Sequence, residues 1–206
     1  MLILKPEIKE ITFHTPNNYT AETWLEAVGR TCYMSADKTK ENSSSRFIKM
    51  LLDRKHLSIF EHIVVSCRIV ADRGFTHELV RHRISSYAQE SSRYCNYSKG
   101  KFNNEISIIE YPWKKKNSYN KVKNVLELVE QLYMELLEDG ETPELARAIL
   151  PISLKSEIVI TTNLREWMNI FDLRTGSSAH PIIREIMIKI LNEFERKLPS
   201  IFTKNL

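Results

Sequence analysis

Arginine, histidine and serine side chains gather in one stretch, residues 72–97, and these are groups that bind anionic oxygens. The stretch holds four arginines, two histidines and four serines. In it, Arg81, His82 and Arg83 are followed after seven residues by Ser91, and Arg93 comes two residues later. Guanidinium forks and hydroxyl donors suit phosphate and carbonyl oxygens. The other interpretation is a surface loop whose charges are simply solvated. The residue types therefore predict an anion-binding site or a solvated basic face.

The beginning of this stretch predicts a short helix. Asp72 is a good N-cap, because its carboxylate can accept hydrogen bonds from the first backbone N–H groups. Phe75 and Leu79 supply apolar anchors. Such a helix would place Arg81 and His82 at its C-terminal end, where cationic side chains interact favourably with the helix dipole.

A second polar set follows an expected strand at residues 158–162. It consists of Asn163, Arg165, Asn169 and Arg174. Arg165 and Asn169 are four residues apart, so they share one face of the helix expected over 164–173. The plainer interpretation is that Asn163 only caps this helix and Arg165 is a solvated charge.

Arg147 lies between two alanines in a short apolar helix that Thr142 and Pro143 can begin. A buried guanidinium needs a partner. Two partners are possible, a salt bridge to Glu144 or an anionic ligand, and the sequence favours neither.

Two other kinds of site have weak support. His56 and His62 do not have the spacing of metal ligands on a helix, and no carboxylate cluster completes a site, so no metal is expected. Ser91 and His82 would suggest a hydrolase, but the chain has no GxSxG motif. Ser91 is therefore expected to position a ligand rather than to attack it.

Length and charge limit the class of protein. The 206 residues suffice for one domain, residues 1–206, with a full core. A net charge of +4 and a pI of about 8.9 favour small anionic ligands and fall short of a dedicated nucleic-acid binder. No run of about 18 apolar residues predicts a membrane span. No GxGxxG or Walker A loop occurs, so a nucleotide would be bound through side chains.

The cysteines indicate the compartment. Three occur, far apart and without a CxxC pair, which predicts neither a disulfide framework nor a zinc site. The N-terminus lacks a signal-peptide pattern. We therefore expect a cytoplasmic protein.

Apolar periodicity predicts the remaining elements and an α+β fold. Strands are expected at residues 2–4, 63–71, 105–109 and 158–162. Helices are expected after Thr20, around 47–51, over 122–136 and 164–173, and from Pro181 onward. The polar residues 37–45 are expected to form a loop. The first of these helices carries on one side Trp24, Leu25, Val28 and Cys32.

Several segments together resemble the motifs of one known family, the flavin-dependent thymidylate synthases. The segments are HLSIFEH at His56–His62, THELV at Thr76–Val80, RHR followed after seven residues by SSRY at Arg81–Tyr94, ELARAILP at Glu144–Pro151, and NLREWMNIFDLR at Asn163–Arg174. The resemblance covers about residues 55–185, with the motifs in order.

This resemblance implies an α/β fold, with a mixed central sheet flanked by helices, and a homotetramer whose sites are shared between chains. It implies a methyltransferase that converts dUMP to dTMP. FAD would be the cofactor and pass a hydride, methylenetetrahydrofolate would supply the carbon, and NADPH would supply the electrons. No cysteine would attack the pyrimidine, and no nucleic acid or membrane would be a partner. Two alternatives are a nucleotide- or RNA-binding module and a flavoenzyme that methylates uracil in RNA.

The resemblance also implies roles for individual residues. The positions that match flavin contacts are His56, Ser58, Arg81, His82, Arg83, Gln89, Asn163, Leu164, Arg165 and Asn169. The positions that match dUMP contacts are Glu78, Leu79, Val80, Arg81, Gln89, Glu90, Ser91, Ser92, Arg93, Arg147 and Arg174. Arg174 matches the catalytic residue that polarises the uracil. The chain departs from the family at Glu78, where many members have glutamine, and at Ser178, where many have histidine that could stack on the flavin.

Overall fold

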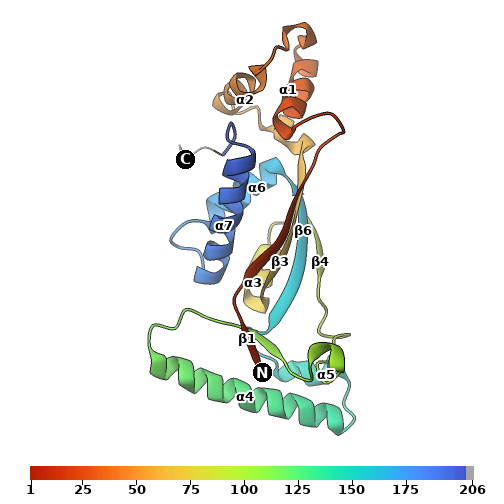
Figure 1. The fold of residues 1–206 in the computed structure, drawn as a ribbon, viewed down its shortest axis with the longest axis vertical. Helices are drawn as coiled ribbons and strands as arrows, with labels where there is room; N and C mark the ends of the chain where they lie inside the picture. The colour runs from red at the N-terminus through yellow and green to blue at the C-terminus, as the bar shows by residue number, and fades with distance from the viewer. Residues whose placement is uncertain (203–206) are drawn as a thin grey trace. The chain divides into compact units, whose positions relative to one another are not determined.

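The computed structural model describes residues 1–202 (Figure 1). Contacts between backbone positions divide the chain into two compact units, and each is described by itself. Unit 1 comprises residues 1–7, 69–81 and 88–159, and unit 2 comprises residues 8–68, 82–87 and those from 160 onward. Within the described residues, no helix has both the length and the apolar character needed to cross a membrane. That residues 1–206 form a single domain stays a prediction.

The strands of the described residues form two sheets. In the smaller one, β1 (Leu2–Leu4) pairs in parallel with β5 (Ser107–Ile109). The larger has the order β2-β3-β6-β4. Its strands are β2 (Glu7–His14), β3 (Val64–Asp72), β4 (Ser86–Gln89) and β6 (Lys155–Asn163). The predicted α/β class is confirmed, and the strands at β2 and β4 were not predicted.

Unit 1 packs its helices around a small apolar core. Its helices are α3 (Arg73–Leu79), η3 (Gly100–Phe102), α4 (Lys116–Glu138), α5 (Pro143–Ala146) and η4 (Arg147–Ile149). Tyr133 of α4 is fully buried in this core with Ile106 and Ala146. The predicted N-caps are confirmed, since Asp72 Oδ1 accepts a hydrogen bond from the backbone of Phe75 at 2.5 Å and the Thr142 side chain caps α5.

The apolar side chains of α4 are only partly buried in the chain. Val125, Leu128 and Leu132 are 58%, 65% and 46% exposed. Their i, i+3, i+7 spacing places them on one side of the helix. Exposed apolar side chains that gather in this way are typical of an interface.

Unit 2 contains the other helices. They are α1 (Ala21–Cys32), η1 (Ala36–Lys38), α2 (Ser43–Asp53), η2 (Leu57–His62), α6 (Leu164–Arg174) and α7 (Pro181–Lys197). Thr20 caps α1 as predicted. Leu25 is buried, whereas Cys32 on the same predicted side is exposed. The loop expected at 37–45 was partly wrong, because it includes most of η1 and the first turn of α2.

An aromatic cluster forms the core beneath α6 and α7. Trp167 lies with its ring centroid 5.2 Å from that of Phe194, which also contacts Phe13 and Phe202. The Trp167 indole N–H donates to the carbonyl of Val65 at 3.2 Å, which fixes α6 to β3. The helix that carries the second polar set therefore starts from a rigid support.

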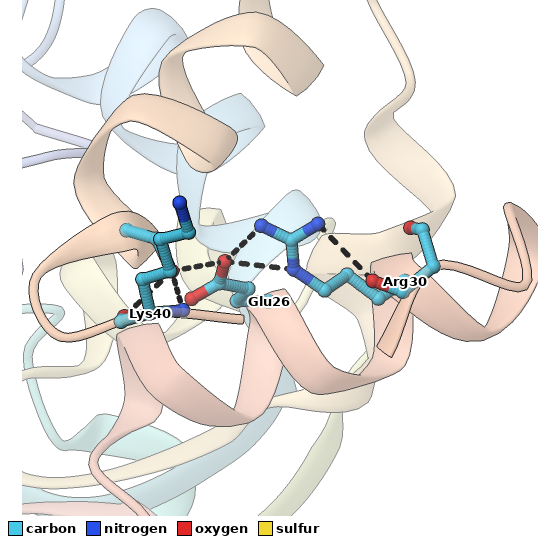
Figure 2. A network of polar contacts seen from close by, with 5 residues as sticks. Glu26, Arg30 and Lys40 are labelled. Atoms are coloured by element: carbon cyan, nitrogen blue, oxygen red, sulfur yellow. Dashed lines mark hydrogen bonds and ion pairs between the residues drawn. The ribbon is translucent and has the colours of Figure 1, made fainter. Parts of the chain in front are cut away.

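A buried ion pair joins α1 to the start of α2 (Figure 2). Glu26 and Arg30 are 2% and 8% exposed, and the arginine donates twice to Glu26 Oε1, at 2.9 and 2.6 Å. Ser43 Oγ donates to the same oxygen at 2.6 Å. Its hydroxyl also lies 2.8 Å from the backbone carbonyl of Lys40. One carboxylate thus holds the α1–α2 hairpin together.

We expect Glu26→Gln to lower the free energy of unfolding by about 3 kcal/mol, because it leaves the buried Arg30 charge without its counter-ion. Urea unfolding monitored by circular dichroism measures this loss. The matched control is Glu185→Gln, which removes an exposed pair with Lys189 and is expected to cost less than about 0.5 kcal/mol. Equal urea midpoints for the two variants would show that the buried pair does not hold the hairpin.

Candidate active site

The loop that carries His82 is held in unit 2 by hydrogen bonds to its backbone. The Tyr87 hydroxyl donates to the carbonyl of His82 at 2.8 Å. The Thr162 hydroxyl at the end of β6 donates to the carbonyl of Ile84. The imidazole of His82 is 4% exposed. The middle residue of the RHR motif is thus an interior group, and its neighbours Arg81 and Arg83 are exposed.

Glu166 links this histidine to α6. Its Oε1 lies 3.2 Å from His82 Nδ1 and accepts a hydrogen bond from the Asn169 amide at 3.1 Å. Its backbone N–H donates to the side chain of Asn163, the predicted N-cap, at 2.9 Å. A glutamate that is 7% exposed thus connects three positions of two sequence motifs.

Arg174 completes the chain of contacts. Its Nε–H donates to His82 Nε2 at 3.1 Å. Because an arginine N–H can only donate, Nε2 must be the acceptor and Nδ1 must carry the proton that is donated to Glu166. The order of contacts is therefore Arg174 to His82 to Glu166, with a neutral imidazole in the middle.

The environment of His82 favours this neutral form. Burial lowers its pKa from the ordinary value, the hydrogen bond to Glu166 opposes that effect, and the positive charge of Arg174 lowers the pKa further. The imidazole is therefore uncharged near neutral pH, and it does not repel the guanidinium that it contacts.

We expect Glu166→Gln to lower the pKa of His82 further, since the substitution removes the negative charge that favours the imidazolium. An NMR titration of the His82 ring protons, assigned with a His82→Gln variant, measures the shift. Glu193→Gln, at a half-exposed residue of α7 paired with Arg196, serves as the control and should leave the pKa of His82 unchanged. A pKa that stays constant or rises in Glu166→Gln would show that the carboxylate does not set the protonation of His82.

A large cavity opens beside α6 in unit 2. It has a volume of about 1110 Å³, above the range of about 300–1,000 Å³ for typical ligand pockets. Its walls include three predicted flavin positions, Asn163, Arg165 and Asn169, together with apolar side chains such as Met168 and Phe202. Four carboxylates also line it, and one of them, Glu61, forms an ion pair with Arg165 at 2.5 Å.

A second cavity of about 530 Å³ shares Arg165 with the first. It is lined by the predicted His56 and Ser58, and by Lys55. The lining of this cavity contains no carboxylate. The Tyr33 hydroxyl lies 2.8 Å from His56 Nδ1 and holds that ring in place. The two cavities together offer amides, cations and apolar surface that suit the pyrophosphate and flat ring of an anionic dinucleotide, and the four carboxylates lie only in the first cavity.

In unit 1, two predicted dUMP positions use their side chains to support the fold. The Gln89 amide donates to Thr76 at 3.0 Å and to Ser156 at 3.1 Å. Glu90 Oε2 accepts from Lys155 at 2.6 Å, and its other oxygen accepts from a tyrosine hydroxyl. Both side chains thus tie β4 and the loop after it to β6.

The serines and arginines after β4 have different partners. Ser92 is buried, and its Oγ accepts a hydrogen bond from Arg147 Nη1 at 3.2 Å. Ser91 Oγ accepts from the backbone N–H of Arg93 at 3.3 Å. Arg93 pairs with Glu144 at 2.8 Å, with both side chains about half exposed. The salt bridge considered between Arg147 and Glu144 is therefore replaced by one between Arg93 and Glu144.

The remaining predicted positions divide by exposure. Leu79 and Leu164 are fully buried, so any ligand contact from them involves the backbone. Glu78 is half-buried, and Val80 is 38% exposed. Ser178 is an exposed residue of the loop between α6 and α7. The structure brings His82, Asn163, Asn169 and Arg174 together in unit 2, and Ser92 and Arg147 together in unit 1.

Sequence reasoning missed Glu166 as a member of this network. In the sequence it stands three residues after an N-cap, where a glutamate is a usual capping partner. The signal in the sequence was the position of Glu166 on the expected helix. It lies one helical turn from both Asn163 and Asn169, so the three side chains share one face.

Comparison with known proteins agrees with the motifs. The family model of thymidylate synthase complementing protein matches residues 15–200. A flavin-dependent thymidylate synthase from Pyrococcus furiosus is 34% identical over 189 residues, covering 87% of this chain and 78% of the relative. Those from Pyrococcus abyssi and Geobacter sulfurreducens are 37% and 29% identical, covering 79% and 92% of this chain and 67% and 82% of theirs. The chain therefore belongs to the thymidylate synthase complementing protein family, the family of the flavin-dependent thymidylate synthases.

Proposed function

We propose that this chain catalyses the reductive methylation of dUMP to dTMP, with methylenetetrahydrofolate as carbon donor, NADPH as reductant and FAD as cofactor. The observation that carries the proposal is the contact chain Arg174–His82–Glu166–Asn169 in unit 2. It joins two motifs that are more than eighty residues apart in the sequence. Family membership supports this activity over an RNA-binding module.

For the cofactor, we propose that the two cavities of unit 2 hold FAD. Arg165 lines both, and Lys55 stands in the one without carboxylates, so these cations suit the pyrophosphate. Asn163 and Asn169 offer amide groups that suit the polar edge of a flat ring. When bound, FAD would supply the carrier for a hydride between NADPH and the nucleotide.

Arg174 has the electrostatic role in this proposal. A guanidinium beside a uracil carbonyl stabilises the negative charge that develops as the ring becomes nucleophilic. His82 holds Arg174 by its Nε and, being neutral, leaves the positive charge of Arg174 undiminished. His82 and Glu166 are positioning residues in this scheme, and Arg174 is the catalytic one.

Two of the three thiols, those of Cys67 and Cys95, are poorly suited to act as nucleophiles. Burial raises the pKa of Cys67 well above its ordinary value. Burial, with the charge of Glu90 nearby, also raises the pKa of Cys95. Since the thiolate is the reactive form, neither group is activated for attack on a pyrimidine.

For assembly, we propose a homotetramer in which dUMP meets residues from more than one chain. Support comes from the exposed apolar side of α4, formed by Val125, Leu128 and Leu132, which suits burial against another copy. We further propose that both units act as one synthase domain, because the family model spans them, and that the enzyme works in the cytoplasm.

The purified protein tests this function by its absorbance. With FAD bound it should be yellow, lose its colour with NADPH under anaerobic conditions, and lose it faster when dUMP is present. Protein that neither retains FAD nor bleaches with NADPH would overturn the proposal.

A further inference from the structure

A third cavity, of about 310 Å³, lies within unit 1. Its polar lining comes from Arg73, His77, Ser92 and Arg147. The rest of the wall is apolar, from the segment 148–154. Two of the four polar residues, Ser92 and Arg147, are dUMP positions by resemblance, whereas Arg73 and His77 have no assigned role.

The charges around this cavity are unbalanced. Its nine lining residues include two arginines and no carboxylate. Neither Arg73 nor Arg147 forms an ion pair within residues 1–202, the part of the chain that the structure describes. Among the acids of unit 1, Glu90 binds Lys155 and Glu144 binds Arg93. The buried Asp72, which precedes Arg73, caps α3 through Oδ1 and does not line the cavity. Half-buried guanidinium groups without a counter-ion favour an anion as ligand.

The backbone holds Arg73 against this cavity. Its N–H lies 3.1 Å from the carbonyls of both Ile152 and Leu154 in the opposite wall. Its Nη1 makes a long contact of 3.4 Å with the carbonyl of Glu90. That contact is the guanidinium's one hydrogen bond to the described residues, and a guanidinium has five N–H donors. The Arg73 guanidinium is therefore held at the cavity and keeps N–H donors for a ligand.

We propose that Arg73 is a second phosphate-binding arginine, which acts with Arg147 on the phosphate monoester dianion of the nucleotide substrate. Two planar forks and the Ser92 hydroxyl match the three terminal oxygens of such a group. His77 lies one helical turn after Arg73 on α3 and extends the same polar wall. The proposal rests on the proposed function and adds a residue that determines specificity for the phosphorylated substrate.

A phosphate contact far from the reacting ring binds the ground state and the transition state alike. Its loss therefore raises KM and leaves kcat nearly unchanged. A lost charge-assisted hydrogen bond corresponds to a fall in affinity of about tenfold to over a hundredfold. Deoxyuridine has no phosphate, so its affinity should not depend on Arg73.

Calorimetry on the FAD-supplemented protein tests this inference, with dUMP and deoxyuridine as probes. Arg73→Met should bind dUMP about tenfold to over a hundredfold more weakly and deoxyuridine as the wild type does. Arg73→Lys keeps the charge but lacks the planar guanidinium. Its affinity for dUMP should lie between those of Arg73→Met and the wild type. Arg196→Met, at an exposed arginine of α7, should bind dUMP normally. Urea midpoints for each variant establish that it is folded.

Two results would overturn the inference. One is a dUMP affinity in Arg73→Met and Arg73→Lys equal to that of the wild type. The other is an equal loss for dUMP and deoxyuridine, which would place Arg73 away from the phosphate. Failure of the proposed function would be recognised differently, by the absence of dTMP formation by the wild type. In that case Arg73→Met could still weaken the binding of dUMP and not that of deoxyuridine.

Discussion

Replacing Arg174 with alanine is expected to lower kcat by about tenfold to over a hundredfold and to leave the protein folded. A charge-assisted hydrogen bond contributes about 1.5–3 kcal/mol, which corresponds to this range when the contact forms mainly in the transition state. Arg174 is the last residue of α6 and stands outside the Trp167–Phe194 cluster. The aromatic core should therefore survive its loss.

Steady-state kinetics and the urea midpoint together measure this effect. A second readout comes from His82, whose pKa should rise in Arg174→Ala because the guanidinium lowers it in the wild type. Arg196→Ala on α7 is the control, with wild-type turnover and stability expected. If Arg174→Ala turned over dUMP at the wild-type rate, Arg174 would have no catalytic role.

Mixing two weakly active variants is expected to restore activity. At dUMP concentrations well below KM, Arg147→Ala and Arg174→Ala should each turn over much more slowly than the wild type, because the first loses affinity and the second loses kcat. If the two arginines of one site come from different chains, a mixed oligomer contains some sites with both arginines intact. Co-expression with two different affinity tags, followed by tandem purification, isolates the mixed species for assay.

The size of the assembly and its activity give separate answers. Light scattering should show a tetramer. A tetramer whose mixtures stay inactive would mean that both arginines reach each site from the same chain. A fully active monomer would contradict shared sites altogether. Each variant co-expressed with itself under both tags, and purified in the same way, controls for activity from contaminating wild-type enzyme.

Local signals in the sequence predicted the elements that carry the site. Asp72, Thr142 and Asn163 each cap a helix as expected, because a cap depends on residues only a few positions away. β2 and β4 were missed because neither has a clear apolar run: three of the first four residues of β2 are charged, and β4 has only four residues. The stripe on α4 predicted a helix correctly, but periodicity does not say whether the chain itself or another copy covers it.

The network around His82 could be predicted from the sequence only in part, because it depends on contacts between distant segments. The motifs identified His82, Asn169 and Arg174 separately. Their connection through Glu166 depends on a contact across 84 positions of sequence, which no spacing rule predicts. In the sequence, Arg73 was one of four arginines in the stretch 72–97. Only the structure distinguishes it from the other three, because it lines a cavity without a carboxylate.

The most direct test is dTMP formation under anaerobic conditions from dUMP, methylenetetrahydrofolate and NADPH, with FAD-loaded protein. We predict that dTMP appears with all components present, and that omitting FAD, the folate or NADPH abolishes it. Formation of dTMP by flavin-free protein, or none by the complete mixture, would contradict a flavin-dependent thymidylate synthase.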